Sequence, residues 1–143
     1  MSGPLPFALD TRDVLDDTPA WVGPSGAVFA TRAPGADPPP VLTVAWLEEP
    51  PGPGLDDVML EELARSDPDS VVIDYQAVRV NGVPAVRTLT VHREGGGVLL
   101  ASEQWRLLAA GCRWTISAST GLLDQAAYGP GLAAVAETFR VIA

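Results

Sequence analysis

The chain has 143 residues, of which 47% are apolar and 19% are charged. That length fits a single domain with enough apolar material for its own core, so we expect one domain over residues 1–143. The formal net charge of −9 excludes nucleic-acid phosphates and anionic lipid surfaces as main partners, because both would be repelled.

The first residues show neither the basic region nor the apolar region of a secretory signal, and no stretch reaches the roughly 18 apolar residues that a membrane helix needs. Cys112 is the only cysteine, so neither an internal disulfide nor a cysteine metal cluster is expected. We therefore expect a cytoplasmic protein without stable membrane insertion, metal or other cofactor.

The first half of the chain predicts few regular elements. Residues 1–19 show no periodic pattern and are expected to be irregular. Strand-like runs follow at 26–31 and 41–47, and a loop rich in Pro and Gly follows each run, at 33–40 and at 50–54. Apolar residues spaced i, i+3, i+4 and i+8 then predict a helix at 55–66.

The second half predicts a meander of four strands, at 71–80, 83–92, 98–108 and 112–119. Asn81-Gly82 suits the type I′ turn of a hairpin between the first two strands. A second helix is expected near the end, with Pro130 at its first position, followed by a short extended tail. The predicted fold class is α+β: a twisted antiparallel sheet of about six strands packed against two main helices.

Alternation assigns the two faces of this sheet. In the last strand Trp114 and Ile116 point to one side, and Arg113 and Thr115 point to the other. We expect both helices to cover the apolar face. We also expect the 41–47 strand to lie at an edge. Such a strand is able to pair with a second copy of the chain in a homodimer, whereas the prolines in the flanking loops oppose this pairing, so the sequence leaves the oligomeric state open.

The polar face is the candidate binding surface. It is either simply solvated, as many antiparallel sheets are on one side, or it receives a segment of another protein. Trp21, beside Pro19 and Gly23, is the tryptophan expected to be partly exposed and to contact that partner. The candidate binding residues are Trp21, Thr88, Gln104, Arg106, Arg113 and Thr115.

Other reactive side chains have simpler interpretations. His92 is expected on the polar side of a strand end without an oriented partner for catalysis. Cys112 alternates with Trp114 and is expected as buried filler. Glu103 falls among apolar positions, where an unpaired carboxylate would be costly, so we expect a structural ion pair with Arg87. The sequence predicts no catalytic residue and no metal ligand.

Two stretches resemble the PsbP-like and DcrB-like superfamily. Residues 78–87 contain Gly82-Val83-Pro84-Ala85 between two strands, and residues 128–140 resemble that group's closing helix with its terminal Phe-Arg. The order of elements from about residue 20 onward is similar as well. The resemblance implies a twisted antiparallel sheet flanked by helices.

Most members of this superfamily are not enzymes. They include a photosystem II extrinsic subunit, a nuclear-transport GTPase-binding protein, actinobacterial LpqN-like lipoproteins and cytoplasmic chaperones of type VI secretion effectors. The lipobox cysteine of the lipoproteins is missing here, which disfavours that branch.

Three hypotheses about function follow. The first is a non-enzymatic protein-binding module, an adaptor or chaperone for a secreted or membrane-destined protein. The second is a small-ligand or lipid-binding protein with a cavity between sheet and helices, lined by Met59, Leu63, Trp105 and Phe139. An enzyme is the third, and it would have to use Glu103, Arg87 and His92.

Overall fold

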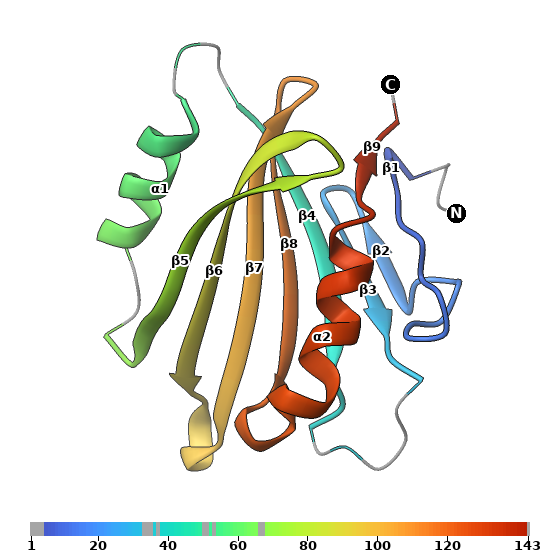
Figure 1. Ribbon diagram of the computed structural model, residues 1–143, viewed down its shortest axis with the longest axis vertical. Coiled ribbons are helices and arrows are strands. Elements are labelled where there is room, and N and C mark those ends of the chain that lie inside the picture. The colour runs from blue at the N-terminus through green and yellow to red at the C-terminus, as the bar shows by residue number, and fades with distance from the viewer. Residues whose placement is uncertain are drawn as a thin grey trace.

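The computed structural model describes residues 5–32, 36, 38–49, 52, 54–65 and 68–142. Within them the chain forms a seven-stranded antiparallel sheet, a two-stranded ladder and two α-helices (Figure 1). The α+β class is thus confirmed, with one strand more in the main sheet than the six expected. In spatial order, the strands of this sheet are β2 (Trp21–Gly23), β3 (Gly26–Ala30), β4 (Val41–Glu48), β8 (Cys112–Gly121), β7 (Leu99–Ala109), β6 (Val83–Arg93) and β5 (Ser70–Val80).

The predicted meander is confirmed as β5, β6, β7 and β8, each paired with the next. Asn81 and Gly82 have φ of 49° and 85°, as the type I′ turn requires. A 3-10 turn, η1 (Gly95–Gly97), joins β6 to β7. The loops expected at 33–40 and 50–54 lie partly outside the described residues, which do not include 33–35, 37, 50, 51 and 53.

One face of the sheet carries the apolar core, and α2 (Gln125–Ala136) covers it. Figure 1 shows α2 in front of the sheet, and its buried residues Leu132, Val135 and Ala136 belong to the same cluster as the inward tryptophans Trp105 and Trp114. The alternation predicted for β8 is therefore confirmed. Aromatic rings close the cluster at one end through contacts among Phe7, Trp46, Trp114 and Phe139.

The helix α1 (Leu55–Ala64) lies on the opposite, polar face, so the expectation that both helices cover the apolar face is wrong. Acidic residues favour its first turn, and Asp57 Oδ2 accepts a hydrogen bond from the Gly54 N–H at 3.2 Å. Within α1 only Val58 and Met59 are buried. Two physical causes hold it there: Val58 and Met59 bury apolar area, and the Glu62 carboxylate meets Arg106 and Arg113 of the polar face.

The N-terminal segment is more ordered than expected. β1 (Phe7–Ala8) pairs with β9 (Arg140–Val141), and Leu15 forms a bridge with Thr31. Phe7 and Leu15 are buried in the core, which explains why this segment is held in place despite its lack of periodicity. Residues 1–4 lie outside the described part of the chain.

Two further expectations are wrong. β4 lies between β3 and β8 and not at an edge, because the short strands before it add to its outer side. A 3-10 turn, η2 (Leu122–Asp124), leads into α2, which begins five residues before Pro130. The proline is exposed, so solvent can satisfy the carbonyl that its missing N–H leaves free.

No helix in the described residues is long and apolar enough to cross a membrane.

Candidate functional site

All six candidate binding residues lie on the polar face of the sheet. One row of paired positions crosses this face from edge to edge: Trp21, Val28, Thr43, Ser117, Gln104, Thr88 and Tyr75. A neighbouring row pairs Thr115 with Arg106. Trp21 is four strands away from Gln104, about 19 Å at roughly 4.8 Å for each strand. The face therefore has two parts, one beneath α1 and one that extends uncovered towards Trp21.

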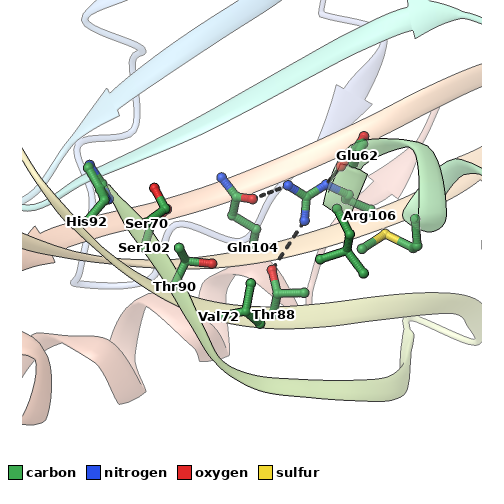
Figure 2. Close-up of a pocket in the computed structure, with 11 residues that line it drawn as sticks. Glu62, Ser70, Val72, Thr88, Thr90, His92, Ser102, Gln104 and Arg106 are labelled. Carbon is green, nitrogen blue, oxygen red and sulfur yellow. Dashed lines mark hydrogen bonds and ion pairs between the residues drawn. The ribbon is translucent and has the colours of Figure 1, made fainter. Parts of the chain in front are cut away.

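A pocket of about 280 Å³ opens beneath α1 (Figure 2). Its helix wall and one strand position provide apolar groups, whereas its floor provides hydroxyl, amide and imidazole groups. Three candidate residues, Thr88, Gln104 and Arg106, take part in it. The lining residues are Met59, Glu62, Leu63, Ser70, Val72, Thr88, Thr90, His92, Ser102, Gln104 and Arg106.

Arg106 forms one end of this pocket and contacts three polar side chains of the chain itself. Its Nε contacts the Glu62 carboxylate, its Nη2 donates to Gln104 Oε1, and its Nη1 donates to Thr88 Oγ1 at 3.2 Å. Burial lowers the pKa of Arg106, although the charge of Glu62 opposes that effect. An arginine stays protonated in proteins, so this group is a fixed cation whose charge is balanced by α1.

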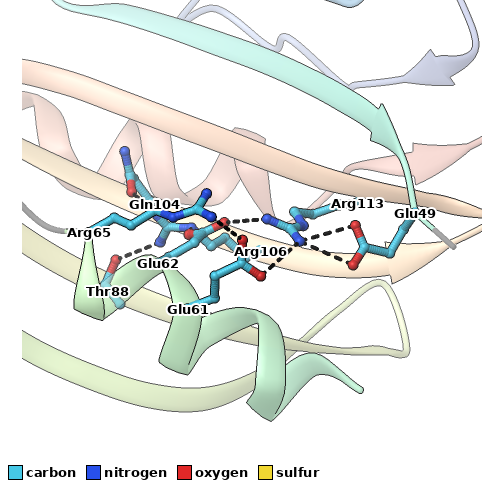
Figure 3. Close-up of polar contacts among 8 residues, drawn as sticks. All are labelled: Glu49, Glu61, Glu62, Arg65, Thr88, Gln104, Arg106 and Arg113. Carbon is cyan, nitrogen blue, oxygen red and sulfur yellow. Dashed lines mark hydrogen bonds and ion pairs between the residues drawn. The ribbon is translucent and has the colours of Figure 1, made fainter. Parts of the chain in front are cut away.

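Arg113 continues the same ionic cluster beside the pocket (Figure 3). Its Nη2 donates to Glu49 Oε1 at 3.1 Å, and its Nη1 donates to Glu62 Oε1 at 3.5 Å. The hydrogen bond and charge of Glu49 raise the pKa of Arg113, with smaller contributions from Glu62 and Glu61. Glu62 thus bridges two arginines of the sheet and fixes α1 above it.

Thr115 and Trp21 lie on the uncovered part of the face. Thr115 is half-buried and pairs with the exposed Ala45 of β4. Trp21 is 56% exposed, as expected from the sequence. Its indole lies over the backbone of Gly23, since a Cβ there would be 2.2 Å from Trp21 Cη2. A glycine is needed at this position for the ring to lie flat on the strand.

The other reactive residues behave largely as predicted. Arg87 Nε donates to the Glu103 carboxylate, which confirms that pair, and its Nη1 also donates to Asp74 Oδ2 at 2.9 Å. Burial lowers the pKa of Arg87, but the bonds and charges of Glu103 and Asp74 outweigh it, so the net pKa is raised. His92 lies 3.1 Å from Glu94 Oε1 and lines the pocket. Cys112 is only half-buried.

In the described residues, no group of three His, Cys, Asp or Glu side chains is placed to hold a metal ion.

The cavity expected between sheet and helices differs from the observed pocket. Met59 and Leu63 line the pocket, but Trp105 and Phe139 are buried in the core on the opposite face. They cannot share one cavity, because the sheet separates the two helices. The sequence interpretation also missed Glu62 and Glu49. A signal for the Glu62 contact was present in the sequence. Arg106 and Arg113 lie on the polar side of two paired strands, and the predicted helix at 55–66 carries the acidic pair Glu61-Glu62.

Comparisons with known proteins give the fold but not the function. No protein-family model matches the sequence, and no curated protein is significantly similar to it. Among solved structures, PA94 of Pseudomonas aeruginosa, described as a protein of unknown function, superposes with a TM-score of 0.71 at 16% identity, over 83% of this chain and 84% of that chain.

The solution structure of the cyanobacterial PsbP of Synechocystis superposes with a TM-score of 0.60 at 17% identity, over 97% of this chain and 84% of that chain. The chain has a PsbP-like fold. A Bacteroides thetaiotaomicron protein matches with a TM-score of 0.63 at 11% identity, and this chain spans only 46% of its length. The PsbP-like fold expected from residues 78–87 and 128–140 is thus confirmed, whereas these identities carry no information about partners.

Proposed function

We propose that the chain is a non-enzymatic protein-binding module, a cytoplasmic adaptor or chaperone for a secreted or membrane-destined protein. The observation that carries this proposal is the row that crosses the polar face. It links an exposed tryptophan, Trp21, to the pocket that holds Gln104 and Thr88. An exposed aromatic ring at one end and a receptive pocket at the other are typical of a surface that binds another protein.

The two parts of the face offer different contacts. Between Trp21 and α1, the surface has small or β-branched side chains such as Thr43, Ala45, Thr115 and Ser117, and the exposed Leu47 lies at the end of the same face of β4. These side chains present hydroxyl groups and methyl groups with little rotamer entropy to lose. Because Arg106 and Arg113 are engaged with carboxylates of this chain, the directional bonds to a partner come from hydroxyl and amide groups.

The size of the pocket suits a single side chain of a protein partner. Its volume of about 280 Å³ lies just below the roughly 300–1,000 Å³ of typical ligand sites. A side chain fits such a volume, and the rest of a protein partner would lie on the uncovered face beside it.

A small-ligand or lipid-binding function is the second candidate. The observation that favours it is the apolar wall of the pocket, formed by Met59, Leu63 and Val72 opposite the polar floor. An amphiphilic molecule would match that arrangement, with its apolar part beneath α1 and its polar part near Gln104.

Photo-crosslinking in the native cytoplasm tests the proposal. A photoreactive amino acid replaces Ala45, which is exposed on the polar face. In the control it replaces Ala127, which is exposed on α2, the helix that covers the apolar face. We expect one protein to crosslink from position 45 and not from position 127, with a severalfold lower yield when Trp21 is changed to Ala. Equal yields from the two positions would contradict the proposed face.

The same material distinguishes the second candidate. Mass spectrometry of the purified, uncrosslinked protein under native conditions shows whether a small molecule accompanies it. A protein that carries a stoichiometric lipid or metabolite, with no crosslinked partner from position 45, would support the ligand-binding function instead.

A further inference from the structure

The two edges of the large sheet are very different within the described residues. β2 has three residues, whereas β5 has eleven. β5 contains no proline or lysine, the residues that often protect an edge against pairing. A register shift between Val72 and Asp74 interrupts its ladder with β6, so the regular part of the edge runs from Asp74 to Val80.

The outward backbone groups of this edge follow from the hairpin. The turn at 81–82 closes on a hydrogen-bonded pair, and antiparallel pairs alternate along the ladder. Alternation therefore points the backbone N–H and C=O of Tyr75, Ala77 and Arg79 away from β6. The Tyr75 N–H donates to Asp74 Oδ1 at 3.0 Å instead of to β6, which agrees with this assignment.

A groove of about 700 Å³ lies beside this part of β5. The first turn of α1 forms one wall, with the exposed side chains of Asp56 and Asp57. Ala77 and Arg79 belong to the other wall, and the guanidinium of Arg79 donates to the Gly82 carbonyl at 2.9 Å. Every second side chain of a strand added beside β5 would point into this groove, because side chains alternate along a strand.

We propose that the outer edge of β5, from Tyr75 to Val80, binds an extended basic segment of a partner protein as an additional antiparallel strand. Backbone hydrogen bonds provide the affinity in this mode, and the groove selects the side chains. The inference goes beyond the proposed function, because it concerns an edge and a groove outside the row that links Trp21 to the pocket.

Charge decides which occupant the edge takes. The whole chain has a net charge of −9. The groove presents the carboxylates of Asp56 and Asp57 on its α1 wall against the single guanidinium of Arg79, which donates to the Gly82 carbonyl, on the β5 wall. A second copy of the chain would bring the same negative charge to the contact and would be repelled. A segment that carries Arg or Lys on the face that meets the groove complements it, so a basic partner segment is favoured over a homodimer.

Synthetic peptides provide the probe. The basic set consists of acetyl-Arg-Thr-Val-Thr-Val-Thr-Arg-amide and of versions in which each Val is replaced by Ile, Leu or Phe. The acidic set has the same sequences with Glu in place of each Arg. Fluorescence anisotropy at low salt measures binding. We expect basic peptides to bind one per chain, and the acidic versions to bind at least about tenfold more weakly.

Alternate N-methylation of the best peptide identifies the mode. Methyl groups on one set of amides, the set that faces β5, should abolish binding, and methyl groups on the other set should leave it largely unchanged. Equal loss from both sets, equal retention by both sets, or no binding by any basic peptide would overturn the proposal.

Two variants place the contact on the chain. Ala77→Pro removes an outward N–H, a change that an edge strand tolerates, and should reduce peptide binding at least tenfold with an unchanged circular dichroism spectrum. If this variant fails to fold, Asp56→Arg serves instead, with Asp13→Arg as the matched control at another exposed aspartate. Equal peptide binding by Asp56→Arg and Asp13→Arg would contradict the role of the groove. If the wild-type protein forms a dimer and Asp56→Arg makes that dimer tighter, a second copy of the chain occupies the β5 edge.

Discussion

The two faces of the sheet are held to their helices by different forces. α2 covers its face through apolar side chains that are almost completely buried, such as Leu132 and Val135. α1 buries two apolar residues, and the Glu62 carboxylate joins it to Arg106 and Arg113. Burial of apolar area gives most of the stability of a fold. The α2 face therefore contributes most of the apolar burial, and the α1 face keeps polar groups and an uncovered surface.

The largest expected effect lies in the α2 face. Leu132→Ala removes a fully buried side chain from the core and should lower the free energy of unfolding by about 3–4 kcal/mol. Urea denaturation followed by tryptophan fluorescence measures it.

The matched control is Leu60→Ala in α1, because that leucine is 67% exposed. This control should change the free energy of unfolding by less than about 0.5 kcal/mol. Similar losses in the two variants would mean that the loss at Leu132 does not come from its burial in the core.

The second prediction concerns the charged group within the otherwise apolar series of the α2 face. Glu103 is only 5% exposed. Glu103→Gln leaves Asp74 as the only charged partner of the Arg87 guanidinium and should cost about 2–3 kcal/mol, less than a completely buried pair because Arg87 is partly solvated. Urea denaturation of the variant measures the loss.

A double variant shows whether the loss comes from leaving Arg87 without Glu103 or from a net stabilisation of the fold by the Arg87–Glu103 pair. Glu103→Leu with Arg87→Met takes both charges away, and it should recover much of the lost stability. A double variant less stable than Glu103→Gln would show that the pair itself stabilises the fold.

The third prediction concerns α1. Glu62→Gln removes the charge that bridges Arg106 and Arg113, and should cost about 1 kcal/mol in global stability because the group is partly exposed. The local effect is concentrated in this helix, since Glu62 is the residue of α1 that contacts both Arg106 and Arg113. Amide hydrogen exchange should accelerate in residues 55–64 and remain unchanged in α2.

Glu61→Gln is the control for this prediction. Glu61 is more exposed, reaches Arg113 only at 4.0 Å and forms an i,i+4 ion pair with Arg65 at 3.1 Å. Its change to Gln should therefore accelerate the exchange of α1 much less than Glu62→Gln does. Equal acceleration in the two variants would show that helix charge in general, and not the Glu62 bridge, holds α1 in place.

The sequence predicted the parts of the fold that local patterns encode. Alternation placed Trp114 and Ile116 on one face, Asn81-Gly82 marked the hairpin, and the apolar spacing marked α1 to within two residues of its end. These signals are local because each depends on residues that are neighbours in the chain.

The side of the sheet that α1 covers was not predictable from its apolar pattern. An apolar stripe indicates that a helix packs on something, and gives no information about which face it meets. The position of β4 inside the sheet was not predictable for the same reason. It depends on β2 and β3 adding beside β4, and the local pattern of β4 does not encode that. The candidate residues on the polar face were grouped correctly by alternation, but the engagement of Arg106 and Arg113 by Glu62 required the three-dimensional arrangement.

The smallest expected effect is at Trp21, on the uncovered part of the α1 face. Gly23→Ala places a Cβ where the indole now lies, and the ring must turn away from the strand. Because the ring is 56% exposed and moves as the end of a side chain, the free energy of unfolding should change by less than about 0.5 kcal/mol.

The indole N–H resonance of Trp21, assigned with a Trp21→Phe variant, should shift in Gly23→Ala. The crosslinking yield from position 45 should fall with it, because an aromatic ring contributes to binding only when it is held in the conformation that the partner contacts. A shifted resonance with an unchanged yield would remove Trp21 from the binding surface and leave the pocket beneath α1 as its centre.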